Sequence, residues 1–118
     1  MRLTVRKSDL FLADLEAQFG WYEMEAGEEI ALRYLAAVDR TVEELTERPD
    51  RGRLRHFEHP ELEGLRSFLV ARPFHRHLIF YRHDETTLDL VRVMHGARDL
   101  PWRLRQTPGA EEEESAVQ

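Results

Sequence analysis

Three strand-like segments follow one another in RSFLVARPFHRHLIFYRHDETTLDLVRVMHG, residues 66–96 of the 118-residue chain. Each is rich in aliphatic, β-branched and aromatic side chains, as strands are. The segments are residues 66–70, 77–81 and 88–94. Pro73 separates the first two, and the middle segment is almost continuously apolar, as expected of a central buried strand. Because the connections are short, the stretch predicts antiparallel neighbours in one sheet, with the last strand ending at Gly96.

Two helical stripes precede these strands, with apolar residues recurring three and four positions apart. The first stripe consists of Leu12, Leu15, Phe19 and Tyr22. The second consists of Ile30, Ala31, Tyr34, Val38, Val42 and Leu45. Ser8 is a suitable N-cap for the first helix, and Ala26-Gly27 provides a break between the two. The second helix should stop before Pro49, because proline disfavours helical geometry in the residue before it. The short link predicts an antiparallel helical hairpin.

A short strand at Leu3 and Val5 completes the order β-α-α-β-β-β. Helices lie early and strands late, so the fold class is α+β rather than alternating and parallel. We expect the helical hairpin to pack on one face of a mostly antiparallel sheet. Residues 50–64 are polar and contain two glycines and a proline, so they are predicted to be loop. The second face of the sheet should then meet solvent or a partner.

The charge is unevenly spread along the chain. Residues 1–50 hold 6 basic and 12 acidic side chains, whereas residues 51–110 hold 11 basic and 7 acidic ones. Four consecutive glutamates, Glu111–Glu114, follow. We therefore predict one domain over residues 1–105 and an acidic disordered tail over residues 106–118. The sequence pI of about 5.5 argues against indiscriminate nucleic-acid binding, although a local basic face remains compatible with it.

Several classes of protein are excluded by what the sequence lacks. There is no cysteine, so disulfides and thiol chemistry are absent and a cytoplasmic location is expected. No apolar run is long enough to span a membrane, and the N-terminus lacks the apolar core of a secretory signal. The histidine pairs His56/His59 and His75/His77 each offer two metal ligands, fewer than a structural zinc site needs. We predict no metal and no cofactor.

Six short motifs, in this order and at these spacings, resemble the RelE/ParE superfamily of toxins from type II toxin–antitoxin systems. They are FGWYE (19–23), RYLAAV (33–38), PDRGR (49–53), GLR (64–66), HLIFYR (77–82) and RVMHGARD (92–99). The resemblance runs from about Leu3 to Pro101 and is closest to the ParE-like, plasmid-stabilisation branch. It implies a toxin that inhibits growth and is neutralised by a cognate antitoxin in a hetero-oligomer.

The resemblance implies two different activities, because the two branches share one fold. One branch poisons DNA gyrase, and the other cleaves mRNA in the ribosome. The gyrase activity is favoured here, because the chain is acidic overall and has only one lysine. A third possibility is an inactive module that still binds an antitoxin. Opposite charge also motivates the hypothesis that the acidic tail shields the basic stretch in the free toxin.

Each activity implies its own site residues. As a ribonuclease, the chain would use His95 as acid or base, with Arg66 and Arg98 as phosphate clamps. As a protein-binding toxin, it would present cationic and aromatic anchors of the kind enriched at binding hot spots. The predicted target-binding residues are Arg66, Arg76, Arg82, Arg98 and Trp102.

Most of these residues also have a structural interpretation. Arg66 or Arg92 would pair with helix carboxylates, Arg98 with Asp99, and His95 would be a satisfied histidine at a strand end. Gly96 would meet a backbone requirement there. Trp21 and Tyr22 are expected to pack between helix and sheet.

Overall fold

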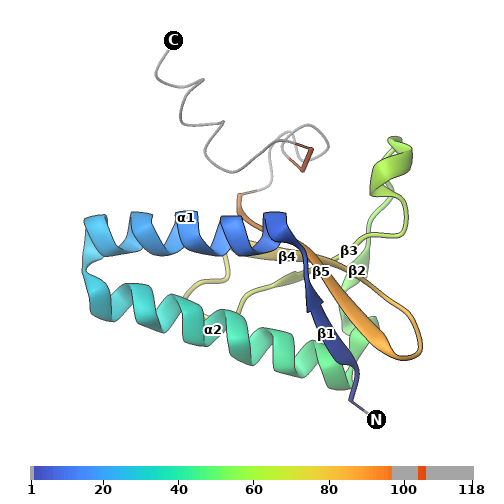
Figure 1. Ribbon diagram of the computed structural model, residues 1–118, viewed down its shortest axis with the longest axis horizontal. Coiled ribbons are helices and arrows are strands. Elements are labelled where there is room, and N and C mark those ends of the chain that lie inside the picture. The colour runs from blue at the N-terminus through green and yellow to red at the C-terminus, as the bar shows by residue number, and fades with distance from the viewer. Residues whose placement is uncertain (1, 97–103, 106–118) are drawn as a thin grey trace.

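The computed structural model describes residues 2–96 and 104–105, and its two helices lie on a five-stranded mixed sheet (Figure 1). The predicted α+β fold class is therefore confirmed. The regular elements, in chain order, are β1 (Thr4–Lys7), α1 (Asp9–Ala26), α2 (Glu28–Glu47), the 3₁₀ turn η1 (Pro49–Arg51), β2 (Arg53–Leu54), the 3₁₀ turn η2 (Pro60–Leu62), β3 (Arg66–Leu69), β4 (His77–His83) and β5 (Thr87–His95). The predicted acidic tail, residues 106–118, lies outside the described residues.

The strand order in the sheet is β1-β5-β4-β3-β2. The three late strands β3, β4 and β5 pair antiparallel, as the sequence predicted. β2, in the segment predicted to be loop, pairs antiparallel with β3, and β1 pairs with β5 in parallel. A parallel pair needs a long crossover between its strands, and here the helices and β2–β4 provide it. A bulge interrupts the β4–β5 pairing, because Phe80 faces Arg92 while Tyr81 faces Leu90. Val91 is thus the extra residue of β5.

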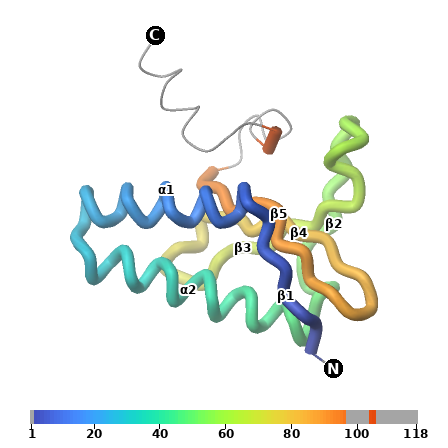
Figure 2. Tube along the Cα trace, in the orientation of Figure 1, coloured from blue at the N-terminus to red at the C-terminus, as the bar shows by residue number. Residues whose placement is uncertain are grey.

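The helical hairpin forms where the sequence predicted it. The Ser8 hydroxyl accepts a hydrogen bond from the Phe11 amide and caps α1. Gly27 adopts φ +94°, which L side chains rarely reach, and so joins α1 to α2. Figure 2 shows this joint at the opposite end of the molecule from the loop around η2. Among residues 2–96 and 104–105, neither helix combines the length and the apolar character that crossing a bilayer requires.

The main core lies between the hairpin and one face of the sheet. From α2 it receives Tyr34, Ala37, Val38, Val42 and Leu45, and from the sheet Ile79, Tyr81, Leu88, Leu90 and Val93. The α2 stripe is thus confirmed. The α1 stripe is wrong at one position, because Leu12 is 46% exposed and Phe11 is fully buried in its place. Three- and four-residue spacing gives the direction of a helix face only to within about one residue.

The second face of the sheet differs from the prediction, because the chain itself covers it. A second cluster consists of Leu62, Leu65, Phe80, Met94 and Leu104. The predicted loop 50–64 supplies part of this cover and contains β2, η1 and η2. The segment was predicted to be loop because most of its residues are polar. Single apolar residues such as Leu62 nevertheless anchor it to the sheet.

Candidate functional site

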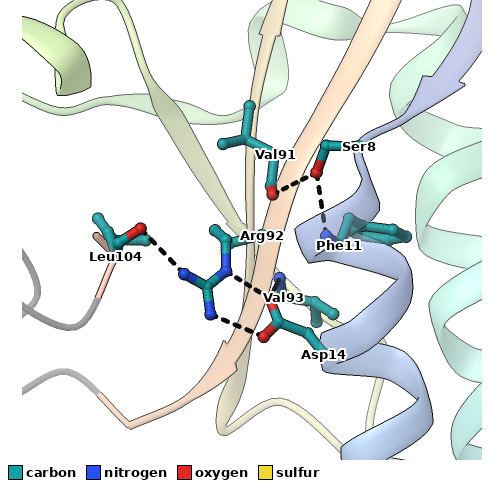
Figure 3. Close-up of polar contacts among 7 residues, drawn as sticks. All are labelled: Ser8, Phe11, Asp14, Val91, Arg92, Val93 and Leu104. Carbon is teal, nitrogen blue, oxygen red and sulfur yellow. Dashed lines mark hydrogen bonds and ion pairs between the residues drawn. The ribbon is translucent and has the colours of Figure 1, made fainter. Parts of the chain in front are cut away.

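A buried ion pair between Arg92 of β5 and Asp14 of α1 organises the centre of the molecule (Figure 3). The Arg92 Nε and NH2 groups donate to the two carboxylate oxygens at 2.7 and 2.8 Å. The two side chains are only 2% and 6% exposed. The predicted pairing of Arg92 with a helix carboxylate is confirmed. A buried charge of this kind is tolerated because it is paired and hydrogen-bonded.

The same carboxylate caps the edge of β5 beyond the end of β1. Asp14 Oδ2 accepts a hydrogen bond from the Val93 amide at 3.1 Å. Six residues earlier, the Ser8 hydroxyl donates to the Val91 carbonyl at 2.8 Å (Figure 3). Ser8 and Asp14 therefore satisfy the Val91 carbonyl and the Val93 amide, and this part of the edge is closed to strand addition.

Arg92 also anchors the chain after β5. Its NH1 group donates to the carbonyl of Leu104 at 2.9 Å, and the Leu104 side chain is buried in the second cluster. The predicted residues Arg98 and Trp102 belong to the interval between these two anchor points. Both belong to residues 97–103, which lie outside the described residues.

The sheet end formed by the start of β4 and the end of β5 brings Arg76 and His95 together. The Gly96 amide donates to the Arg76 carbonyl at 3.1 Å, and both side chains, Arg76 and His95, are exposed. Gly96 has φ +82°, which confirms its predicted backbone role. This end therefore presents one cation and one histidine to solvent.

A buried histidine lies directly beneath His95. The ring centroids of His77 and His95 are 5.0 Å apart in an edge-to-face arrangement. His77 Nε2 lies 2.8 Å from the Tyr22 hydroxyl, and its Nδ1 is buried with no hydrogen-bond partner among the described residues. Burial, and then the neighbouring His95, lower the pKa of His77 to about 4. His77 is therefore neutral near pH 7. The predicted packing between helix and sheet is confirmed for Tyr22 and wrong for Trp21, which is 50% exposed.

Arg66 lies towards the other end of the sheet, and its side chain binds a backbone carbonyl. Its NH1 group donates to the Gly52 carbonyl at 2.9 Å, and NH2 lies 3.7 Å from Asp50. Its carboxylate partner thus belongs to η1 rather than to a helix of the hairpin. Beside it, the buried Tyr81 hydroxyl donates to the Pro49 carbonyl and accepts from the Gly52 amide. These contacts fix the turn that follows α2.

Arg82 has a comparable role on the second face. Its Nε and NH2 groups donate to the carbonyls of Glu63 and Glu61 at 2.9 and 2.7 Å. Two backbone acceptors satisfy much of the guanidinium group, so Arg82 holds the loop around η2 against the sheet. Its predicted part in target binding remains untested.

The structure separates the residues predicted to form a catalytic set. Arg66 faces Tyr81 on β4, whereas His95 faces His77. His77 and Tyr81 are four residues apart, and the rise per residue of an antiparallel strand makes this about 13 Å along β4. Arg98 lies outside the described residues. Of the cationic residues predicted for the site, the described part of the chain places only Arg76 beside His95.

Asp14 and His77 did not appear among the predicted site residues. The sequence does contain an indication that Asp14 is buried. Its carboxylate lies on the same helix face as Phe11 and Leu15, in an otherwise apolar stripe. His77 carries no such signal, because a histidine at the start of an apolar strand does not reveal a tyrosine 55 positions away. Within the described residues, no three His, Asp or Glu side chains converge to hold a metal ion.

Comparisons with known proteins place this geometry in context. Residues 5–100 match the family model of the ParE toxin of type II toxin–antitoxin systems, parDE. A chain of the chromosomal ParDE system from P. aeruginosa is similar in fold, with a TM-score of 0.65, 21% identity and coverage of 81% of this chain and 98% of that one. A chain of the toxin–antitoxin complex RelBE2 from Mycobacterium tuberculosis has a TM-score of 0.54 and 26% identity, with coverage of 80% and 99%. Curated protein sequences give no match.

Proposed function

The chain belongs to the ParE toxin family of type II toxin–antitoxin systems, and we propose that it inhibits growth by binding and poisoning DNA gyrase. We further propose that a cognate antitoxin neutralises it. The two similar structures come from a ParDE system and a RelBE2 toxin–antitoxin complex, which supports a partner of this kind. The choice of gyrase over the ribosome needs a separate argument, because the fold serves both activities.

The separation of Arg66 from His95 is the observation that carries this choice. Cleavage of RNA without a metal requires a base, an acid and cations around one phosphate. The β4 residues that face Arg66 and His95 are about 13 Å apart, given the rise per residue of an antiparallel strand. This separation is too large for Arg66 and His95 to act on one phosphate. Arg66 and Arg82 are also bonded to backbone carbonyls. A mode of action by binding requires no such convergence and is therefore favoured.

The proposed contact surface is the sheet end that carries Arg76 and His95. Both side chains are exposed there, and Arg98 and Trp102 follow His95 by three and seven residues in the sequence. Arginine and tryptophan dominate the energetics of many protein interfaces, because each offers a large contact area together with polar groups. We assign target binding to these four residues.

Induction of the chain without its antitoxin tests the proposal. We expect growth arrest with broken DNA and intact transcripts, and rescue when an antitoxin is supplied. Arg76→Glu and Arg98→Glu should each weaken the toxicity more than His95→Ala does. Arg33→Glu is the matched control, because Arg33 is an exposed arginine of α2 whose only ion pair with a described residue is the one with Glu29 in the same helix.

The other outcomes of this experiment contradict the proposal. Cut transcripts with intact DNA, abolished by His95→Ala and by Arg66→Ala, would establish the ribonuclease activity. Normal growth combined with antitoxin binding would identify an inactive interaction module. Toxicity that survives Arg76→Glu, His95→Ala and Arg98→Glu combined would refute the assignment of the site.

A further inference from the structure

Two arginines that have no carboxylate partner in the described part of the chain, Arg53 and Arg55, lie side by side at the β2 edge of the sheet. Arg53 pairs in register with Ser67, which in turn faces Phe80 of the second cluster. The Arg55 amide donates to the Leu65 carbonyl, so Arg55 follows Arg53 at the two-residue strand period. Both side chains therefore belong to the second face of the sheet, at its outermost strand.

The surroundings of Arg55 hold its side chain in place without neutralising its charge. Arg55 NH1 donates to the Ser67 hydroxyl at 3.1 Å, and its guanidinium lies over the Phe57 ring at 5.4 Å. Arg53 is exposed. Within residues 2–96 and 104–105, neither arginine forms an ion pair. Burial, and then the charge of Arg53, lower the pKa of Arg55.

The nearest acidic loop leaves this positive charge uncompensated. Glu61 lies 3.5 Å from Arg105 and is engaged there. Glu58 and Glu63 are exposed, and neither lies within ion-pair distance of Arg53 or Arg55. Two adjacent like charges repel each other, so this edge favours an external anion.

The chain leaves the described residues on this same face. Leu104 is buried in the second cluster, against which Phe57 also packs. Arg105 follows, and Glu111 comes six residues later. Six extended residues span at most about 20 Å. Because Phe57 links the Leu104 cluster to the Arg55 guanidinium, the four glutamates begin within reach of the arginine edge.

We propose that the glutamates Glu111–Glu114 bind Arg53 and Arg55, so that the chain's own acidic segment covers this edge of the sheet. Four carboxylates would meet two guanidinium groups that form no ion pair with any described residue, and arginine binds carboxylates in a bidentate geometry. A short connection gives the segment a high effective concentration at the edge. Each exposed ion pair is weak, so the contact exchanges readily and a stronger anionic partner displaces it. This inference does not depend on which target the toxin binds.

A zero-length cross-link between an amine and a carboxylate tests the contact. Lys7 is the only lysine of the chain and lies in β1, at the opposite edge of the sheet. Arg53→Lys therefore adds a single amine at the proposed contact, and Lys7 serves as a control within the same molecule. Carbodiimide treatment of the full-length variant should join position 53, and not Lys7, to Glu111–Glu114 within one chain. The product should disappear at about 1 M salt, where screening acts within about 3 Å, and when the four glutamates are replaced by glutamine.

Labelling of the natural arginines provides a test that needs no change at the edge. A dicarbonyl reagent should modify Arg53 and Arg55 severalfold faster after Glu111–Glu114 are replaced by glutamine, whereas Arg33 should react at an unchanged rate. Cross-links from position 53 only to Glu58, Glu61 or Glu63, or only between two chains, would overturn the proposal. Protection of the two arginines that appears only after antitoxin or duplex DNA is added would assign the edge to that partner and would also overturn it.

Discussion

Removing the charge of Asp14 should destabilise the fold more than any conservative surface change. The Asp14 carboxylate accepts hydrogen bonds from Arg92 Nε, Arg92 NH2 and the Val93 amide. Asp14→Asn keeps the shape of the side chain but leaves only one oxygen to accept them. The buried Arg92 guanidinium then loses the negative charge that Asp14 supplies. Breaking a buried pair in this way costs about 3–5 kcal/mol. For a domain of this size, that corresponds to a fall in Tm of about 10–20 °C.

The assay is urea unfolding followed by circular dichroism, with Glu16→Gln as the control. Glu16 is an exposed residue of the same helix, and its replacement should change the free energy of unfolding by less than about 0.5 kcal/mol. The double variant Asp14→Leu/Arg92→Met should be less destabilised than Asp14→Asn alone, because it removes both members of the buried pair together. If Asp14→Asn unfolds at the same urea concentration as Glu16→Gln, the ion pair does not hold α1 and Leu104 to β5.

Three further predictions concern the turn after α2, the buried histidine and the packing of a glycine. Tyr81→Phe should lower the free energy of unfolding by about 1–3 kcal/mol, measured in urea, because the Pro49 carbonyl and the Gly52 amide lose their shared partner; an unchanged midpoint would contradict this. Gly52→Ala should cost about 1–3 kcal/mol in the same assay, since its Cβ would overlap the Tyr81 ring and hydroxyl, whereas Gly20→Ala, where the added Cβ meets nothing, should not destabilise the protein. The folded state holds the pKa of His77 at about 4, below its unfolded value of 6.5, so the unfolded state binds the proton first and stability must fall as the pH drops from 6.5 towards 4. Linkage gives a loss of about 2 kcal/mol between pH 7 and pH 5, and His77→Gln should remove that part of the pH dependence.

Periodicity in the sequence was enough to predict the hairpin and the three late strands. Ser8, Gly27 and Pro49 act locally, through a cap, a positive φ and a restricted neighbour, and such effects can be recognised in a short window. Leu12 shows the limit of this reasoning, because small rotations of a helix decide which of two adjacent apolar residues is buried.

Long-range pairings were the part that the sequence did not reveal. β2 consists of two residues and exists only because Arg53 and Leu54 find partners on β3. Asp14 and Arg92 are 78 positions apart, so neither residue indicates the other. The distance between Arg66 and His95 follows from strand register, which depends on the exact pairing of β3, β4 and β5 rather than on composition.

Purified components test the central claim most directly. The toxin is added to DNA gyrase and supercoiled plasmid and, in parallel, to translating ribosomes with a defined mRNA. The account predicts that linear, gyrase-bound plasmid accumulates, that antitoxin prevents this, and that the mRNA stays intact. Cleavage of the mRNA at ribosomes while gyrase keeps its normal activity would contradict it.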